Sequence, residues 1–107
     1  MNYSLVATLS ASLLWLQSSS AFALNNDVVT EGQCGGSGRN QILVNSDATH
    51  KYSVTVRENW KSGVLEGSSD KTYESQPGGR QTIGCTENEG KPVTYFQRYV
   101  VQEAPVS

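Results

Sequence analysis

The sequence is poor in the residues on which several kinds of protein chemistry depend. It has two cysteines and a single histidine, His50. A structural zinc site needs four nitrogen or sulfur ligands, which this set does not supply. It also lacks a Gly-x-Ser-x-Gly segment and a glycine-rich loop ending in Gly-Lys-Ser or Gly-Lys-Thr, the signatures of a hydrolase serine and a phosphate-binding loop. We therefore expect no metal, no other cofactor and no catalytic residues, and we do not expect an enzyme.

An excess of positive charge is also missing. The chain has eight lysines and arginines against ten aspartates and glutamates, for a net charge of −2. A nucleic-acid-binding surface neutralises phosphates with a concentrated excess of lysine and arginine. We therefore expect no nucleic-acid partner.

Long hydrophobic runs are limited to one, Leu5–Leu16, which carries no charge and is followed by Ala21-Phe22-Ala23. Small residues three positions and one position before a cleavage point are typical of a secretory signal peptide, although the positive charge usual before the apolar run is missing. The run is shorter than the roughly 20 residues of a membrane-spanning helix. We predict a signal peptide over residues 1–23, a secreted or periplasmic location, and no membrane insertion after cleavage. An uncleaved anchor is the alternative.

The two cysteines, Cys34 and Cys85, allow only one intramolecular pairing. Disulfides form in the oxidising compartments that exported proteins reach. A small domain with few large apolar residues also needs such a crosslink for stability. We therefore predict a Cys34–Cys85 disulfide. A free reactive thiol or an intermolecular bridge would be the alternatives.

The apolar pattern after residue 23 indicates strands, because no stretch shows a 3.6-residue period with helix caps. The clearest strand is Lys51–Glu58, where Tyr52, Val54 and Val56 alternate with polar residues, as in a half-buried antiparallel strand. Turn sequences such as Pro77-Gly78-Gly79 separate the β-prone segments. We expect about six strands in an all-β fold, a small antiparallel sandwich of immunoglobulin-like or similar type. Its β-prone segments are 41–46, 51–58, 71–76, 80–86 and 92–104, and residues 60–65 could end the strand 51–58 and turn into the next.

The domain organisation predicted from these patterns is simple. Residues 24–40 are rich in glycine and asparagine, and the run Cys34–Gly38 reads as a flexible loop held by the disulfide. We expect this lead-in to precede a sandwich domain formed by residues 41–107.

Aromatic side chains near strand ends are the main candidates for a binding site. Trp60 lies beside Lys61 and Gly63, where it could anchor a protein partner or stack on a sugar, or could instead cap the hydrophobic core. Tyr99 is the second candidate binding residue. Arg57 and Arg98 are expected on the solvent faces of their strands.

Together these patterns predict a small exported, non-catalytic β-sandwich that binds another macromolecule, a protein or a glycan. Binding could use a sheet face, a sheet edge or a loop end, and strand addition at an edge is open to such folds. The alternative is a secreted inhibitor or effector that acts on an enzyme of a host or a competitor. An inhibitor would differ by forming a stoichiometric complex with its enzyme.

Overall fold

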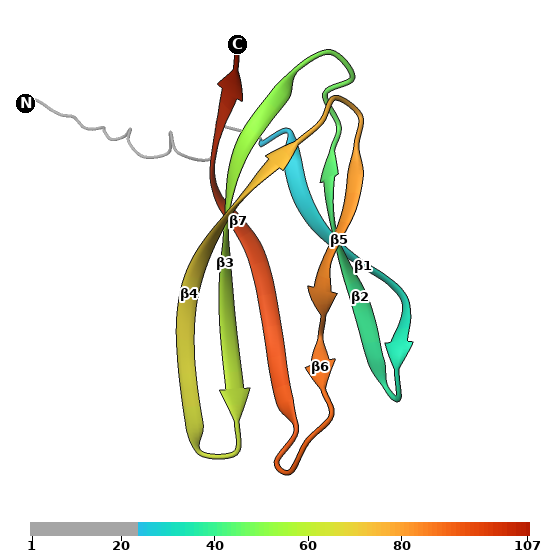
Figure 1. The fold of residues 1–107 in the computed structure, drawn as a ribbon, viewed down its shortest axis with the longest axis vertical. Coiled ribbons are helices and arrows are strands. Elements are labelled where there is room, and N and C mark those ends of the chain that lie inside the picture. Colours follow the sequence, from blue (N-terminus) through green and yellow to red (C-terminus); the bar gives the residue numbers. More distant parts are fainter. Residues whose placement is uncertain (1–23) are drawn as a thin grey trace, which may run out of the picture.

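The computed structural model describes residues 24–107, which form two antiparallel sheets (Figure 1). Sheet A has the order β1-β2-β5, with β1 at Asn26–Gly35, β2 at Gly38–Asn45 and β5 at Arg80–Cys85. Sheet B has the order β4-β3-β7-β6, with β4 at Leu65–Ser75, β3 at Lys51–Ser62, β7 at Thr94–Val106 and β6 at Glu87–Asn88. The predicted all-β fold is confirmed. The predicted signal peptide lies outside the described residues. No helix of a length and apolarity suited to crossing a bilayer occurs within residues 24–107.

The core lies between the two sheets. Leu43 on β2 and Tyr52, Val54 and Val56 on β3 are buried and form one cluster. The alternation predicted for Lys51–Glu58 is therefore confirmed, with one side of β3 facing sheet A. This alternation continues to the end of β3, so the even-numbered residues of the strand all lie on the same side, because its pairing with β4 has no register shift. Residues on that side, and their partners on β4, are said to share its parity. We call the side of sheet B that carries Val54 and Val56 the inner face, and the opposite side the outer face.

Strand β1 occupies most of the segment in which the sequence suggested a flexible lead-in. It pairs with β2 from Asn26 to Gly35, with register shifts on both sides of Gln33. The buried Asn26 side chain explains why an asparagine-rich segment becomes ordered. Its Oδ1 accepts a hydrogen bond of 2.6 Å from Ser75, and its backbone N–H donates to Glu103 at 2.9 Å. Polar bonds therefore hold this strand where large apolar residues are scarce.

Thr86 marks the point at which the chain passes from sheet A to sheet B. Its N–H donates to the carbonyl of Arg39 on β2, and its own carbonyl accepts from the N–H of Phe96 on β7. Figure 1 shows β5 continuing into the short strand β6, beside β7. The two-residue strand β6 lies just beyond the β-prone segment 80–86 predicted from the sequence.

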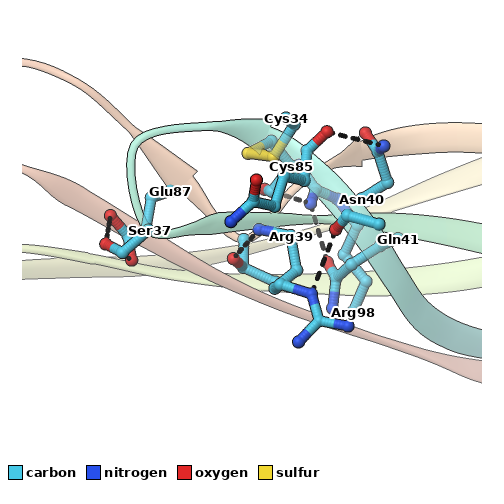
Figure 2. The surroundings of a disulfide bond; sticks show 11 residues. Cys34, Ser37, Arg39, Asn40, Gln41, Cys85, Glu87 and Arg98 are labelled. Atoms are coloured by element: carbon cyan, nitrogen blue, oxygen red, sulfur yellow. Dashed lines mark hydrogen bonds between the residues drawn. A yellow bond between two sulfur atoms is a disulfide. The ribbon is translucent and has the colours of Figure 1, made fainter.

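The predicted disulfide is present and links Cys34 near the end of β1 to Cys85 at the end of β5. Its sulfurs lie against Gly38, where an added Cβ would come within 2.7 Å of the Cys85 sulfur. Glycine at the start of β2 therefore leaves room for the crosslink. Figure 2 shows the disulfide above Asn40 and Gln41 of β2, with Arg98 of β7 on the other side of Gln41.

Candidate functional site

The two candidate binding residues predicted from the sequence lie on opposite faces of sheet B. Trp60 has the parity of Val56 and Glu58 and therefore lies on the inner face. Tyr99 pairs with Arg57 on the neighbouring strand and lies on the outer face. The fold therefore does not bring the two rings together on one surface.

Trp60 is half-buried and packs over its cross-strand partner Gly67. An added Cβ at Gly67 would lie 2.6 Å from two atoms of the indole ring, closer than real side chains approach. Phe96 is the partner of Trp60 on the other side, on β7. The indole therefore spans the inner face at this end of sheet B and has a packing role there.

Tyr99 is an exposed residue with 40% of its surface accessible. Its hydroxyl accepts a long hydrogen bond of 3.4 Å from Nδ2 of Asn59 on β3. The Asn59 oxygen in turn accepts a hydrogen bond of 2.7 Å from the Ser68 hydroxyl on β4. A polar row thus crosses the outer face through three strands.

Asn59 and Ser68 of this polar row also line a pocket of about 590 Å³. Its volume lies within the roughly 300–1,000 Å³ that is usual for ligand sites. Its lining residues form three consecutive triplets on β3, β4 and β7, namely Asn59-Trp60-Lys61, Glu66-Gly67-Ser68 and Tyr95-Phe96-Gln97. The two outer members of each triplet point to the outer face, because the middle members share the inner parity of Trp60. Six of the nine lining side chains therefore point to the outer face, and we assign the pocket to that face, with the backbone of the three strands beneath it.

Several polar groups in this outer-face pocket have no hydrogen-bond or ion-pair partner among the residues that the structure describes. Among residues 24–107, the side chains of Lys61, Glu66, Gln97 and Tyr95 make no hydrogen bond or ion pair with one another or with a neighbour. Elsewhere on the same face the charges are paired, as in the Arg57–Asp70 ion pair at 2.9 Å. The pocket thus gathers donors and acceptors that are free to contact a ligand.

Arg98 supports this end of sheet B from the inner face, and its predicted position in solvent is wrong. Its side chain is only 7% exposed and forms an ion pair of 2.8 Å with Glu58. Its Nη1 also donates to Oε1 of Gln41 and to the carbonyl of Cys85, both at 2.8 Å (Figure 2). The guanidinium is buried because these acceptors from both sheets replace water, as a buried charge requires.

The Arg98 guanidinium also connects the pocket strand to the core. Its central carbon lies 4.8 Å from the centre of the Phe96 ring, in a cation–π contact. Phe96 is the middle residue of the pocket triplet on β7. The buried network therefore fixes the inner side of the strand whose outer side carries Tyr95 and Gln97.

A second polar cluster lies in the turn between β2 and β3. The Asp47 carboxylate accepts hydrogen bonds from the Tyr52 hydroxyl at 2.7 Å and the Thr49 N–H at 2.9 Å, and contacts Nδ1 of His50 at 3.0 Å. The Thr49 and Tyr52 bonds hold the pKa of Asp47 well below its ordinary value, and the same contact with Asp47 raises the pKa of Tyr52. The cluster organises a turn. Within residues 24–107, no three side chains of histidine, cysteine, aspartate or glutamate group as a metal site would require.

Sequence reasoning missed most of the outer-face pocket. The sequence identifies Tyr95 as a tyrosine in a β-prone segment and Lys61 as a charged neighbour of Trp60. It does not predict that they lie side by side, because this depends on the pairing of β3 with β7. Asn59, Glu66, Ser68 and Gln97 carry no pattern that distinguishes them from other polar strand residues. Comparison of the chain with family models, with curated proteins and with solved structures finds no match in any of the three.

Proposed function

We propose that this protein is a non-catalytic binding module that recognises another macromolecule through the outer face of sheet B. The observation that carries the proposal is the outer-face pocket with its free polar side chains. Tyr95, 55% exposed, stands at its edge and supplies a large flat contact surface. Aromatic rings with a polar tip are enriched in binding surfaces because they contribute contact area at low entropic cost.

A binding face is favoured over strand addition because the edges of sheet B carry features that oppose pairing with another chain. On the edge strand β4, Lys71 shares the inner parity of its partner Val56 and lies 3.7 Å from Glu58. An inward-pointing charge on an edge strand is a recognised defence against added strands. On β7, whose other edge pairs with β6 only at Thr94 and Tyr95, a register shift lies in the pairing with β3 beside Thr55, and Pro105 lacks a backbone N–H.

We further propose that the domain is an immunoglobulin-like sandwich exported from the cell. The two-sheet arrangement supports the fold class, and the Cys34–Cys85 disulfide is compatible with an extracellular or periplasmic location. The apolar segment before Leu24 supports export.

The test of the binding face is a comparison of variants on arrays of immobilised glycans and peptides. Labelled protein and the variants Tyr95→Ala and Thr72→Ala are applied to the same arrays. Thr72 is the matched control, because it lies on the outer face of sheet B opposite Thr55 and outside the pocket. We expect at least one probe that the protein and the Thr72 variant retain and the Tyr95 variant loses. Capture of no probe, or capture that does not depend on Tyr95, would contradict the proposal.

A second candidate function, enzyme inhibition, is favoured by one observation. The β3–β4 hairpin ends in Gly63-Val64, where Val64 is 99% exposed and Leu65 is also exposed. A protruding apolar hairpin tip suits insertion into the cleft of an enzyme. This candidate predicts that a panel of proteases and cell-wall hydrolases includes one that is inhibited at a one-to-one ratio, and that Val64→Asp abolishes the inhibition. Inhibition unaffected by Val64→Asp would count against the hairpin.

A further inference from the structure

We propose that the outer-face pocket binds a neutral oligosaccharide, which deepens the proposed function and rests on it. Four features point to this ligand, namely the charge of the pocket, its hydrogen-bonding groups, the two exposed tyrosines of β7 and the pairing of the backbone beneath it. Each of these separates an uncharged sugar chain from another class of ligand.

The charges of the pocket do not select an ionic ligand. Lys61 and Glu66 are its two charged residues, and they are direct cross-strand partners. Their opposite charges leave no net charge across the lining. An anionic or cationic ligand would meet as much repulsion as attraction, because both charges act at short range. A neutral ligand can use both side chains, one as a donor and one as an acceptor.

The free polar groups of the pocket match the needs of sugar hydroxyls. A hydroxyl donates one hydrogen bond and accepts others, so it is best met by a group that does both. The Gln97 amide provides donor and acceptor in one plane, Lys61 adds donors, and Glu66 adds acceptors. The Asn59 and Ser68 side chains already bond to each other, which fixes the adjoining wall of the pocket.

Two exposed rings on β7, Tyr95 in the pocket lining and Tyr99 outside it, extend the candidate surface beyond the size of one sugar. Tyr95 and Tyr99 lie on the outer face with Gln97 between them, and the pairing with β3 is regular over this stretch. Four residues of antiparallel strand span roughly 13 Å. This exceeds the width of a single sugar ring, so the two tyrosines can contact two separate rings of one oligosaccharide. The flat apolar side of a pyranose ring packs well against an aromatic face.

The floor of the pocket argues against a peptide ligand. Extended peptides gain affinity from hydrogen bonds to an open sheet edge, with apolar pockets for alternate side chains. The middle strand of the floor, β3, is paired with β4 on one side and β7 on the other. Its backbone groups are therefore committed to sheet B, and on the edge strand β4 the inward-pointing Lys71 opposes an added strand.

The test is isothermal titration calorimetry of the purified protein with short oligomers of glucose, mannose, galactose and N-acetylglucosamine. Oligogalacturonate serves as a charged analogue and an extended polar peptide as the alternative class. We expect saturable binding of a neutral oligomer, with weaker binding of its monosaccharide and of oligogalacturonate. Tyr95→Ala should lower the association constant by about tenfold through loss of stacking. Gln97→Glu, which removes the amide donor and adds a charge, should also weaken binding, and Thr72→Ala should not.

The outcomes separate this inference from the proposed function. The protein could bind oligogalacturonate or the peptide in preference to every neutral oligomer, with binding that depends on Tyr95. That result would contradict the neutral ligand but would still support the proposed binding face. Binding of neutral oligomers that is unchanged in both the Tyr95 and Gln97 variants would place the ligand elsewhere and overturn the inference. Absence of binding to every neutral oligomer would overturn it as well.

Discussion

Gly84 on β5 lies directly against the guanidinium of Arg98, so that a Cβ at this position would overlap the guanidinium carbon. This contact joins the two sheets, because Gly84 belongs to sheet A and Arg98 to sheet B. The absent side chain allows Arg98 to reach Gln41 and the Cys85 carbonyl. The structure therefore needs glycine here for the space it leaves.

Gly84→Ala should displace Arg98 from its buried acceptors and destabilise the protein. The guanidinium is held by bonds to three partners, so moving it aside breaks several of them at once. We expect a loss of about 3 kcal/mol in the free energy of unfolding, in the range of overpacked cores and broken buried pairs. Urea denaturation measures it. An unchanged urea midpoint would show that Arg98 adapts without loss and that the network contributes little.

Arg98→Met should be more damaging than removal of an exposed arginine. It leaves the Glu58 carboxylate buried without its main partner, and breaking a buried pair in this way costs about 3–5 kcal/mol. Arg57→Met is the matched control, since Arg57 forms an exposed pair with Asp70 on the outer face of the same sheet and should have little effect. The double variant Arg98→Met/Glu58→Leu should recover much of the loss. Equal effects of Arg98→Met and Arg57→Met would refute the structural role of Arg98.

Removal of the disulfide should cost a large part of the stability. The bridge closes a loop with a sequence separation of 51 residues. The chain-entropy relation gives about 4 kcal/mol for a loop of this size. Thermal unfolding of the Cys34→Ser/Cys85→Ser variant, followed by circular dichroism, measures the loss. Intact mass should also fall by about 2 Da on oxidation of the reduced protein, the two hydrogens lost in one bridge. A variant as stable as the parent would contradict the role of the bridge.

Acid should destabilise the turn that contains Asp47. The hydrogen bonds from Thr49 and Tyr52 lower the pKa of Asp47 below its ordinary value of 3.8. A lowered folded-state pKa stabilises the protein above the unfolded-state pKa, and this contribution is lost as the pH falls through the folded-state value. The stability difference between the protein and Asp47→Asn should therefore shrink as the pH falls below about 4. Urea midpoints for both proteins, measured at a series of pH values, test this. A difference that does not change with pH would contradict it.

Alkali should act on the same turn through Tyr52. The bond to Asp47 raises the pKa of the Tyr52 hydroxyl above its ordinary value of 10.0, because ionisation would place two negative oxygens side by side. The contribution of a raised pKa is complete below the unfolded-state value and is lost as the pH rises through the folded-state value. Ultraviolet absorbance titration of the protein should therefore show one tyrosine that ionises at higher pH than the exposed tyrosines. The Tyr52→Phe variant should lack this late step. Titration of all tyrosines together would contradict this expectation.

The half-buried strand β3 and the disulfide could be predicted from the sequence, because each depends on a local pattern or on a single possible pairing. The alternation around Val54 defines a half-buried strand by itself, and two cysteines leave one intramolecular pairing. Arg98 was misplaced because β7 carries apolar residues on both of its faces, so alternation alone does not reveal which side meets sheet A. Its partners Gln41 and Glu58 are distant in sequence and are brought together only by the sheet packing.

The candidate site depended still more on long-range pairing. Trp60 was a candidate because it lies near a strand end, with a core-capping role as the alternative, and its ring packs on Gly67. Tyr99 was a candidate binding residue and its ring is exposed, but the pocket near it arises from the register of three strands and could not be predicted. The strand β1 was missed because its inward residue Asn26 is polar and is stabilised by bonds to Ser75 and Glu103.

The measurement that tests the central claim most directly is a chemical-shift map of the backbone and side-chain amides during titration with the neutral oligosaccharides. A ligand in the outer-face pocket should perturb the side-chain amides of Asn59 and Gln97 and the backbone amides around Lys61, with one common saturation curve. The amides of β1 and of the Asp47 turn should remain unchanged. Saturable changes confined to β1, to the Asp47 turn or to the edge of β4 would contradict the account.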